Sequence, residues 1–322
     1  MNRRRFLTVM TATTIAARCG LGKARADNPG SRPPQAAQPI EVKKAAVVWY
    51  SQTGHTERMG RLIAKTLEKE NIAVTAGACR EMQIEALAEA DLIVLGSPIF
   101  YVDVPEGMQR FLQKLPPLAG KAGAGFVTYG GIGHNVQNTA VRLLHAMRER
   151  GAMPVGHTAF GNMSAFAPTW SFGNDKRTLQ YRHLPNEDTY EQAREFARQI
   201  VLAARNGQED TSETKFSIED MSRSFNLRWW TKLGINHHTI NPETCIQCGA
   251  CEATCPVGAI HLQARQIDHD QCILCLGCVN NCPTGALEME MLNTRLLGFR
   301  RFCEQRGVKV VPPPELADAP TG

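Results

Sequence analysis

Two segments of the sequence repeat one cysteine spacing. "CIQCGACEATCPVGAIHL" begins at residue 245 and "CILCLGCVNNCPTGALEM" at residue 272, so the pattern C-x2-C-x2-C-x3-C-P occurs twice with an offset of 27 residues. Eight positions match, among them all four cysteines and the tail CP-x-GA. Cysteines clustered at a fixed spacing favour metal ligation over a framework of disulfides. The repeat is therefore predicted to bind metal.

The repeat resembles the bacterial two-cluster ferredoxins, over about residues 238–290. In that family three cysteines of each copy bind one [4Fe–4S] cluster, and the fourth, which precedes proline, reaches across to the other cluster. The resemblance implies two clusters. The first cysteine set would be Cys245, Cys248, Cys251 and Cys282, and the second cysteine set would be Cys272, Cys275, Cys278 and Cys255. Structural zinc also uses C-x2-C pairs and is the alternative, but a zinc site does not need the crossover of the fourth cysteine.

Residues 44–206 alternate between strand-like and helix-like segments. Runs rich in β-branched and aromatic residues predict strands, and apolar residues at three- and four-residue spacing predict helices. The predicted strands are 45–50, 72–78, 90–98, 124–131 and 152–162, and the predicted helices are 56–70, 104–115, 135–151 and 187–205. Five strands that alternate with helices predict a parallel sheet with helices on both faces.

The loop after the first predicted strand has the composition of a phosphate site. Its residues are Ser51, Gln52, Thr53, Gly54, His55 and Thr56. Three hydroxyl groups are available, the glycine permits a tight turn, and the start of the next helix adds unpaired N–H groups and the positive end of its dipole. The alternative is a capped loop without a ligand.

The loop resembles the phosphate loop of flavodoxins, with His55 where asparagine is frequent, and the resemblance covers about residues 42–205. It implies FMN and the strand order 2-1-3-4-5, with the loops after strands one, three and four at the flavin. The ring-side candidates are Pro98, Ile99, Phe100 and Tyr101 after the third strand and Gly130 and Gly131 after the fourth. Core packing and an ordinary glycine turn are the alternatives for these two groups.

Together the two resemblances indicate a flavodoxin–ferredoxin fusion. The expected fold is α/β, a doubly wound five-stranded parallel sheet, followed by a small α+β ferredoxin-like domain. The predicted organisation is a signal peptide (1–26), a flexible tether (27–43), an FMN domain (44–206), a linker (207–237), a ferredoxin domain (238–290) and a C-terminal extension (291–322).

Such a chain is expected to transfer electrons between FMN and two [4Fe–4S] clusters, and to exchange them with a redox protein as donor or acceptor. No catalytic acid or base is assigned, so an electron carrier is favoured over an enzyme. The alternative is an FMN-dependent reductase of a quinone or another small acceptor, supplied through the ferredoxin domain. A sensor or scaffold with structural clusters is a third possibility. No G-x-G-x-x-G follows a predicted strand, so direct oxidation of NAD(P)H is not expected.

The first 26 residues hold six basic side chains and no acidic one, and subtracting these from the formal net charge of +5 leaves −1 for the rest. Nucleic-acid binding is therefore not expected. "RRRFL" resembles the twin-arginine export motif, followed by a short apolar stretch and "ARA". This predicts folded export by the twin-arginine machinery, cleavage after Ala26 and a periplasmic location. No apolar run reaches the roughly 18–20 residues of a membrane span, so no permanent anchor is expected.

Overall fold

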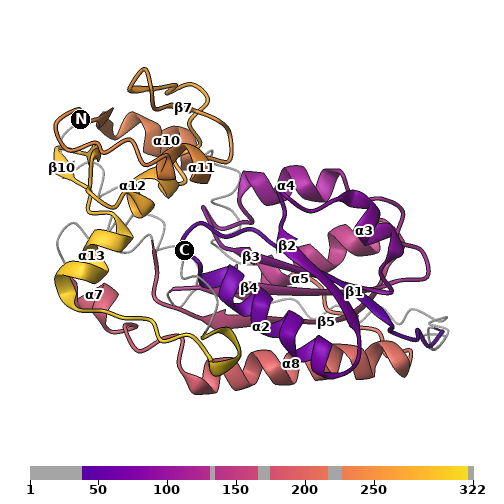
Figure 1. Cartoon of the computed structure of the whole chain (residues 1–322). Coiled ribbons are helices and arrows are strands. Elements are labelled where there is room, and N and C mark those ends of the chain that lie inside the picture. Colours follow the sequence, from indigo (N-terminus) through magenta and orange to yellow (C-terminus); the bar gives the residue numbers. More distant parts are fainter. Residues whose placement is uncertain (1–37, 131–134, 166–174, 217–226, 318–322) are drawn as a thin grey trace, which may run out of the picture. The chain divides into compact units, whose positions relative to one another are not determined.

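A five-stranded parallel sheet forms the centre of the first half of the chain (Figure 1). The computed structural model describes residues 38–130, 135–165, 175–216 and 227–317. The strands are β1 (Lys44–Trp49), β2 (Ala73–Ala78), β3 (Leu92–Pro98), β4 (Ala122–Tyr129) and β5 (Met153–Gly161). Their order is β2-β1-β3-β4-β5 and every pairing is parallel, which confirms the predicted flavodoxin-like fold.

Helices cover both faces of this sheet, as the alternating pattern predicted. The helices are α2 (His55–Lys69), α3 (Ile84–Glu89), α4 (Glu106–Gln113), α5 (Asn135–Arg148) and α8 (Glu187–Arg205). On one face α2 and α8 pack over Ala45 and Val47, whereas on the other α3, α4 and α5 pack over Ala46 and Val48. Successive residues of a strand point to opposite faces, so each buried strand feeds two separate cores.

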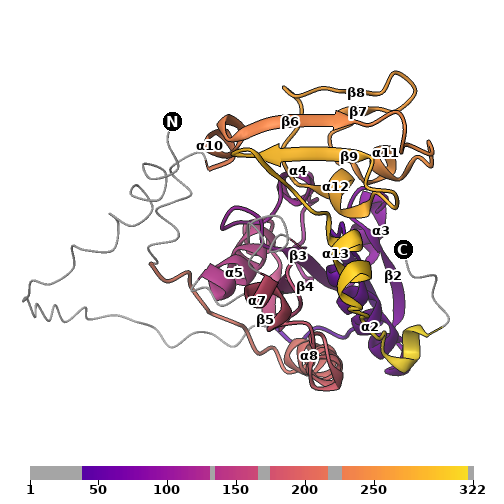
Figure 2. The same cartoon turned by 90° about the vertical axis from the view of Figure 1, so that its left-hand side faces the viewer.

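The second half of the chain contains a small antiparallel fold (Figure 2). The strands β6 (Ile235–Ile240), β9 (Leu287–Met291) and β10 (Thr294–Arg295) form one sheet, and β7 (Ile260–His261) pairs with β8 (Gln266–Ile267). Between them lie the short helices α11 (Ala250–Thr254) and α12 (Gly277–Asn281). β6 begins inside the range predicted as linker, and the fold as a whole is the ferredoxin-like domain that the sequence predicts.

Three further helices are short: α7 (Asp175–Leu179), α10 (Leu227–Leu233) and α13 (Phe299–Arg306). After α13 the chain returns to the flavodoxin-like domain as a C-terminal strap, defined here as residues 308–316 with the 3-10 turn η2 (Pro314–Leu316). The Tyr190 hydroxyl donates to the carbonyl of Val311 at 2.7 Å.

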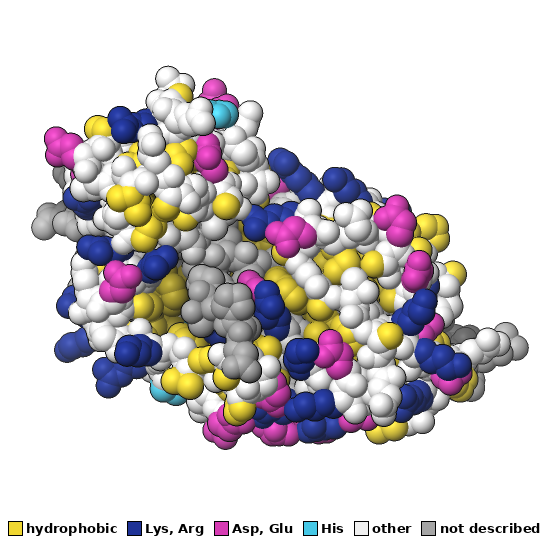
Figure 3. All heavy atoms as spheres, viewed as in Figure 1, with side chains coloured by type: hydrophobic (Ala, Val, Ile, Leu, Met, Phe, Trp, Pro, Cys, Tyr) yellow, Lys and Arg dark blue, Asp and Glu magenta, His cyan; other side chains and the backbone are white. Residues whose placement is uncertain are grey.

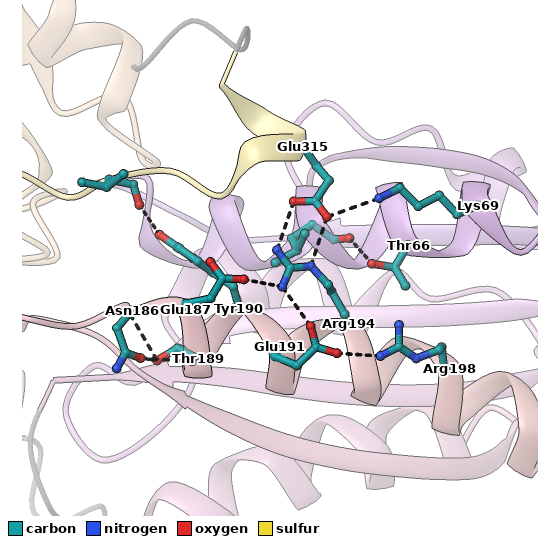
Figure 4. A network of polar contacts seen from close by, with 12 residues as sticks. Thr66, Lys69, Asn186, Glu187, Thr189, Tyr190, Glu191, Arg194, Arg198 and Glu315 are labelled. Atoms are coloured by element: carbon teal, nitrogen blue, oxygen red, sulfur yellow. Dashed lines mark hydrogen bonds and ion pairs between the residues drawn. The ribbon is translucent and has the colours of Figure 1, made fainter.

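The strap ends in an ion-pair network (Figure 4). Glu315 accepts two bonds from the Arg194 guanidinium at 3.0 and 3.1 Å and a longer one from Lys69 at 3.3 Å. Arg194 also reaches Glu187 and Glu191 on its own helix α8. The Arg194 hydrogen bond lowers the pKa of Glu315 to about 2, so this carboxylate is charged at neutral pH.

Charges of both signs are interspersed on the face of the molecule shown in Figure 3. Among the described residues, no helix combines the length and the apolar character that a membrane span requires. The predicted signal peptide (1–26), the tether up to residue 37 and Gly131 lie outside the described residues.

Candidate cofactor sites

The predicted phosphate loop connects β1 to α2 at the carboxyl edge of the sheet. Gly54 precedes the helix with φ 80°, a left-handed conformation that glycine adopts without strain. Its carbonyl accepts the N–H of Arg58 at 2.9 Å, which closes the first turn of α2. The hydroxyl of Thr56 is hydrogen-bonded to that of Thr128 on β4 at 2.8 Å. The loop is thus fixed to the strand that carries the predicted glycine turn.

His55 provides a buried donor without a partner in this loop. Its ring is 6% exposed, and its Nδ1 lies 3.4 Å from Nη1 of Arg58. Burial, followed by the neighbouring Arg58 charge, lowers the pKa of His55 to about 3, so the ring is neutral at pH 7. Because a guanidinium can only donate, Nδ1 accepts and Nε2 carries the proton. That Nε2 is buried and has no hydrogen-bond partner among the described residues.

Two more orphaned oxygens lie at the same loop. Gln52 Oε1 and Asn162 Oδ1 are buried and also lack a partner among the described residues. Asn162 follows β5, and its side chain lies near His55, where it opposes the fall of the His55 pKa although no hydrogen bond forms between the two side chains. Buried polar groups in folded proteins are nearly always paired, so unpaired donors and acceptors at one loop indicate a polar ligand. A phosphate and a ribityl chain supply both kinds of partner, and the loop therefore fits FMN.

The ring-side candidates after β3 have different surroundings. Pro98 ends β3, and Ile99 and Phe100 pack against the core beneath α4 and α5, with Phe100 edge-on to Tyr50 at a centroid distance of 6.1 Å. Tyr101 has φ 50° and donates its hydroxyl to the carbonyl of Leu274 in the ferredoxin-like domain at 3.0 Å. Their contact with a flavin ring remains a prediction.

Gly130 follows β4 at the predicted glycine turn. A Cβ there would lie 2.2 Å from Cα of Ser164, closer than real Cβ contacts come. Only glycine fits this position, because the opposing group is backbone that a rotamer change cannot move. The tight approach joins the loop after β4 to the loop after β5.

The second cysteine set comes together around α12. Burial raises the pKa of the Cys278 thiol well above its ordinary value, and the neighbouring thiols of Cys275, Cys272 and Cys255 raise it further. The fourth cysteine of the first repeat thus lies beside three cysteines of the second, as the crossover requires. His238 on β6 contacts this set, with its Nε2 3.7 Å from Sγ of Cys278.

The first cysteine set lines one small cavity: Cys245, Cys248, Cys251 and Cys282. Burial raises the pKa of Cys251 to about 11, and the Cys282 thiol adds to that rise. Cys248 is exposed, as is its neighbour Ile246, which is 64% exposed. This set therefore reaches the protein surface at Cys248.

The repeated tail CP-x-GA has a structural explanation. Gly258 and Gly285 both adopt left-handed conformations, with φ 67° and 73°. The alanine that follows each glycine donates its N–H to the sulfur of the fourth cysteine: Ala259 to Cys255 at 3.2 Å and Ala286 to Cys282 at 3.1 Å. Such N–H donors stabilise negative charge on a ligated sulfur.

Among the described residues, no three His, Cys, Asp or Glu side chains converge closely enough to hold one metal ion. In a [4Fe–4S] cluster each thiolate binds its own iron, so four thiols arranged around a cavity suit the cluster. With their sulfur-directed N–H groups, both sets fit it.

The phosphate loop contacts α12, the helix that carries Cys278 of the second cysteine set. Nδ2 of Asn281, the last residue of α12, donates to the carbonyl of Gln52 at 2.9 Å. The ring of Phe299 packs edge-on against His55 at a centroid distance of 5.2 Å. Arg80 after β2 donates to the carbonyl of Ala253 in α11. The two candidate sites are therefore neighbours across the junction of the two folds.

Arg58, Asn162 and Tyr50 are among the residues of this region that were not predicted from the sequence. Arg58 follows the loop by one helical turn, which is a local signal that could have been used. Asn162 follows β5, so only tertiary packing brings it to the loop, whereas Tyr50 directly precedes the loop and accepts a hydrogen bond from Gln52 at 3.0 Å.

Two family descriptions match parts of the chain. Residues 244–286 match the "4Fe-4S dicluster domain", and residues 76–166 match "NADPH-dependent FMN reductase". The chain thus joins a flavodoxin-like domain to a 4Fe–4S dicluster domain, which supports FMN and 4Fe–4S as its cofactors and an iron–sulfur flavoprotein in electron transfer. The match favours iron–sulfur chemistry over structural zinc.

Two curated proteins are similar over short segments. An "Iron-sulfur flavoprotein" from Archaeoglobus fulgidus is 31% identical over 75 residues, which are 21% of this chain and 34% of that protein. A "Ferredoxin 7Fe" from Hydrogenibacillus schlegelii is 57% identical over 28 residues, 9% of this chain and 36% of that one. In each case the match spans about a third of the relative's length.

Solved flavodoxins are also similar to this chain. An archaeal flavodoxin shares 22% identity at a TM-score of 0.38, with 52% of this chain and 99% of that one covered. A flavodoxin from Streptococcus pneumonia TIGR4 shares 18% identity at a TM-score of 0.40, over 49% of this chain and 98% of that one. The assignment of the fold rests on the strand order of the sheet and not on these superpositions.

Proposed function

We propose that this chain carries electrons between FMN in the flavodoxin-like domain and two [4Fe–4S] clusters, one in each cysteine set. The observation that carries the proposal is the contact of the phosphate loop with α12, where Asn281 donates to Gln52 at 2.9 Å. Flavins exchange two electrons or one, whereas iron–sulfur clusters exchange one. Together they would connect a two-electron partner to a one-electron partner.

The second cysteine set is proposed as the flavin side of the path. Tyr50 lies between β1 and the phosphate loop, and burial raises its pKa, with the Cys275 thiol as the next cause. The Gln52 side chain donates to the Tyr50 hydroxyl at 3.0 Å. Polar groups of the loop thus lie within interaction distance of a cysteine of the second set.

The first cysteine set is proposed as the side that exchanges electrons with a redox protein. Cys248 is exposed and Ile246 is 64% exposed, whereas all four cysteines of the second set are buried or half-buried. An exposed cluster ligand permits close approach of a partner. The direction of flow, into the flavin or out of it, follows from the potential of that partner.

The test is flash reduction of FMN in the anaerobically purified protein, with cluster absorbance as the readout. The proposal requires bound FMN and about eight irons per chain. Cluster reduction should follow flavin reduction at a rate independent of protein concentration, because both sites belong to one chain. Cys248→Ser, which alters only the first set, should leave the first electron transfer unchanged. A rate proportional to concentration would contradict the proposal.

The second candidate is an FMN-dependent reductase of a quinone or another small acceptor. The match of residues 76–166 to "NADPH-dependent FMN reductase" favours it. If it is correct, NADPH or the reduced clusters will drive steady turnover of a soluble quinone at the flavin. Under the carrier proposal NADPH alone leaves both chromophores oxidised, so one anaerobic titration with NADPH separates the two.

Export of the folded protein by the twin-arginine machinery is proposed from "RRRFL" and "ARA". FMN and the clusters are inserted inside the cell. A chain exported in the unfolded state would lose them, so export of the folded protein is required. N-terminal sequencing of periplasmic protein should begin at Asp27. A mature protein that begins at Met1 would contradict the cleavage, and Arg3→Lys with Arg4→Lys should retain the protein inside.

A further inference from the structure

Gln52 contacts both candidate sites, although its position in the sequence suggested only the phosphate loop. Its backbone carbonyl accepts from Asn281, and its side-chain Nε2 donates to the Tyr50 hydroxyl at 3.0 Å. A Cβ on Gly277 would lie 3.0 Å from the same Nε2, so the amide packs directly on the backbone between Cys275 and Cys278. The chain after β1 and the helix α12 therefore approach one another at Gln52.

The amide lies beside the segment that carries Cys275 and Cys278 of the second set. Gly277, on which the amide packs, comes two residues after Cys275, and the Gln52 side chain opposes the rise that burial causes in the pKa of that cysteine. Gln52 Oε1 is buried and has no hydrogen-bond partner among the described residues, so the Nε2 protons make these contacts. One proton serves Tyr50, and the other is available to the sulfur.

We propose that Gln52 is a positioning residue that ties the phosphate loop to the second cysteine set and donates a hydrogen bond to Cys275 when that sulfur binds iron. The proposal rests on the proposed function for its biological meaning. A donor to a cluster sulfur stabilises the more negative, reduced state and raises the reduction potential. Gln52 would thus raise the potential of the cluster nearer the flavin and leave the other unchanged.

The chain offers a matched control in the first set. The Thr284 hydroxyl lies 3.8 Å from Sγ of Cys282, which belongs to the first set and to the opposite end of α12 from Gly277. Thr284→Val removes that hydroxyl without changing the size of the side chain. It should lower only the midpoint of the first cluster and thereby identify which signal belongs to which set.

The experiment is a redox titration of the holoprotein, followed by electron paramagnetic resonance of the two clusters. Gln52→Leu should lower one midpoint, and it should be the midpoint that Thr284→Val leaves unchanged. For a lost hydrogen bond to a charged group, the reduction equilibrium of that cluster should change by roughly tenfold. Gln52→Glu keeps the shape, loses the donor and adds a negative charge, so its midpoint should fall further. Equal midpoints in wild type and both Gln52 variants would overturn the proposal.

This readout is independent of the proposed function. If the flash experiment on the wild type shows no exchange between FMN and clusters, the carrier proposal fails whatever the midpoints do. If exchange occurs and the Gln52 variants leave the second midpoint unchanged, only the role of Gln52 fails. Gln52→Glu guards against misfolding in Gln52→Leu, and bound iron and FMN are measured in each variant. A shift of the midpoint that Thr284→Val also moves would assign Gln52 to the wrong set and overturn the proposal.

Discussion

The two halves of this chain bury different kinds of side chain. The five-stranded sheet places aliphatic and aromatic groups in two cores, one on each face. The ferredoxin-like core contains Cys251, Cys278 and Cys282 among its buried residues, with further cysteines packed around them. The first half can be stable from apolar burial alone, whereas in the second half the cysteines proposed to bind the clusters are part of the core.

The contact between the halves links these two kinds of core. Where folding depends on bound metal, the positions of the side chains depend on the cluster as well. The phosphate loop packs against this half of the chain at α12. Asn281 and Phe299 reach the loop from elements adjacent to the second cysteine set. Unfolding of the ferredoxin-like half is therefore expected to disturb the FMN site more than loss of FMN disturbs the ferredoxin-like half.

The largest effect should follow removal of iron. An iron chelator under reducing conditions should abolish hydrogen-exchange protection in residues 244–291, because metal binding and folding are coupled there. Protection in β1, β3 and β4 should persist, since their cores contain no ligand of the clusters. Hydrogen exchange read by mass spectrometry measures both halves in one experiment. Full protection of residues 244–291 in iron-free protein would show that the ferredoxin-like half folds without metal and would contradict the prediction.

The second prediction concerns a substitution that destabilises the five-stranded sheet and leaves the ferredoxin-like half unchanged. A Cβ on Gly96 would lie 2.1 Å from the ring of Phe126, which is fully buried between the strands and α8. Gly96→Ala should therefore lower the free energy of unfolding of the flavodoxin-like half by about 3 kcal/mol. Urea denaturation followed by circular dichroism measures this, and cluster absorbance should outlast the first transition.

Gly77→Ala is the control on β2, the edge strand that β1 separates from β3. A Cβ there meets only the end of Met82 at 3.7 Å, an ordinary contact. Its effect should stay within about 0.5 kcal/mol. If both alanine variants lose the same stability, the close packing of Gly96 against Phe126 is not the cause.

Much of this fold could be predicted because its signals are local. Strand order follows from the alternation of strands and helices together with the resemblance to flavodoxins, and the cysteine sets follow from a spacing repeated within 27 residues. The helix α3 was missed because it has six residues and one buried side chain, Leu87, too few to show a helical period.

The candidate site was predicted less completely because its partners come from distant segments. The sequence placed Gln52 and His55 in the phosphate loop, but their neighbours Asn162, Asn281 and Phe299 are set by tertiary packing. The expectation for Tyr101 as a ring-side residue came from position alone, and its hydroxyl bond to Leu274 depends on the docked second fold. Local patterns cannot specify such contacts.

The third prediction concerns the strap that joins the halves. Arg194→Ala should lower stability by about 1–2 kcal/mol, because its side chain and that of Glu315 are only 13% and 16% exposed. Arg198 lies on the same helix with exposed partners, so Arg198→Ala should cost less than about 0.5 kcal/mol. Equal losses would show that the strap does not secure the junction.

The Glu315 carboxyl also sets a pH dependence. Arg194 lowers its folded pKa to about 2, below the value of about 4.3 expected in the unfolded chain. The stability from this pair is therefore complete above about pH 4.3 and is lost as the pH falls toward 2. The difference between wild type and Arg194→Ala, measured by urea unfolding, should shrink over that range. A difference that grows with acidity would contradict the assignment.

The smallest effect should be a change of potential without a change of stability. Nε2 of His238 lies 3.7 Å from Sγ of Cys278, and burial, followed by His269, lowers the pKa of His238 to about 4, so the ring is neutral at pH 7. A sulfur bound to iron has no proton, so the imidazole must be the donor. His238→Leu should lower the midpoint of the second cluster by roughly 20 mV, the equivalent of a long bond worth about 0.5 kcal/mol.

Because the His238 ring is neutral, its effect on the cluster potential should not depend on pH. If the loss arose from a missing charge, the shift would grow as the pH fell from 8 to 6, whereas a hydrogen bond gives the same shift throughout. His237→Leu is the matched control, since His237 is exposed and its Nε2 bonds to Thr239 at 2.8 Å. It should leave both midpoints unchanged. If His238→Leu shifts the midpoint of the first cluster and not that of the second, the assignment of His238 to the second cysteine set is wrong.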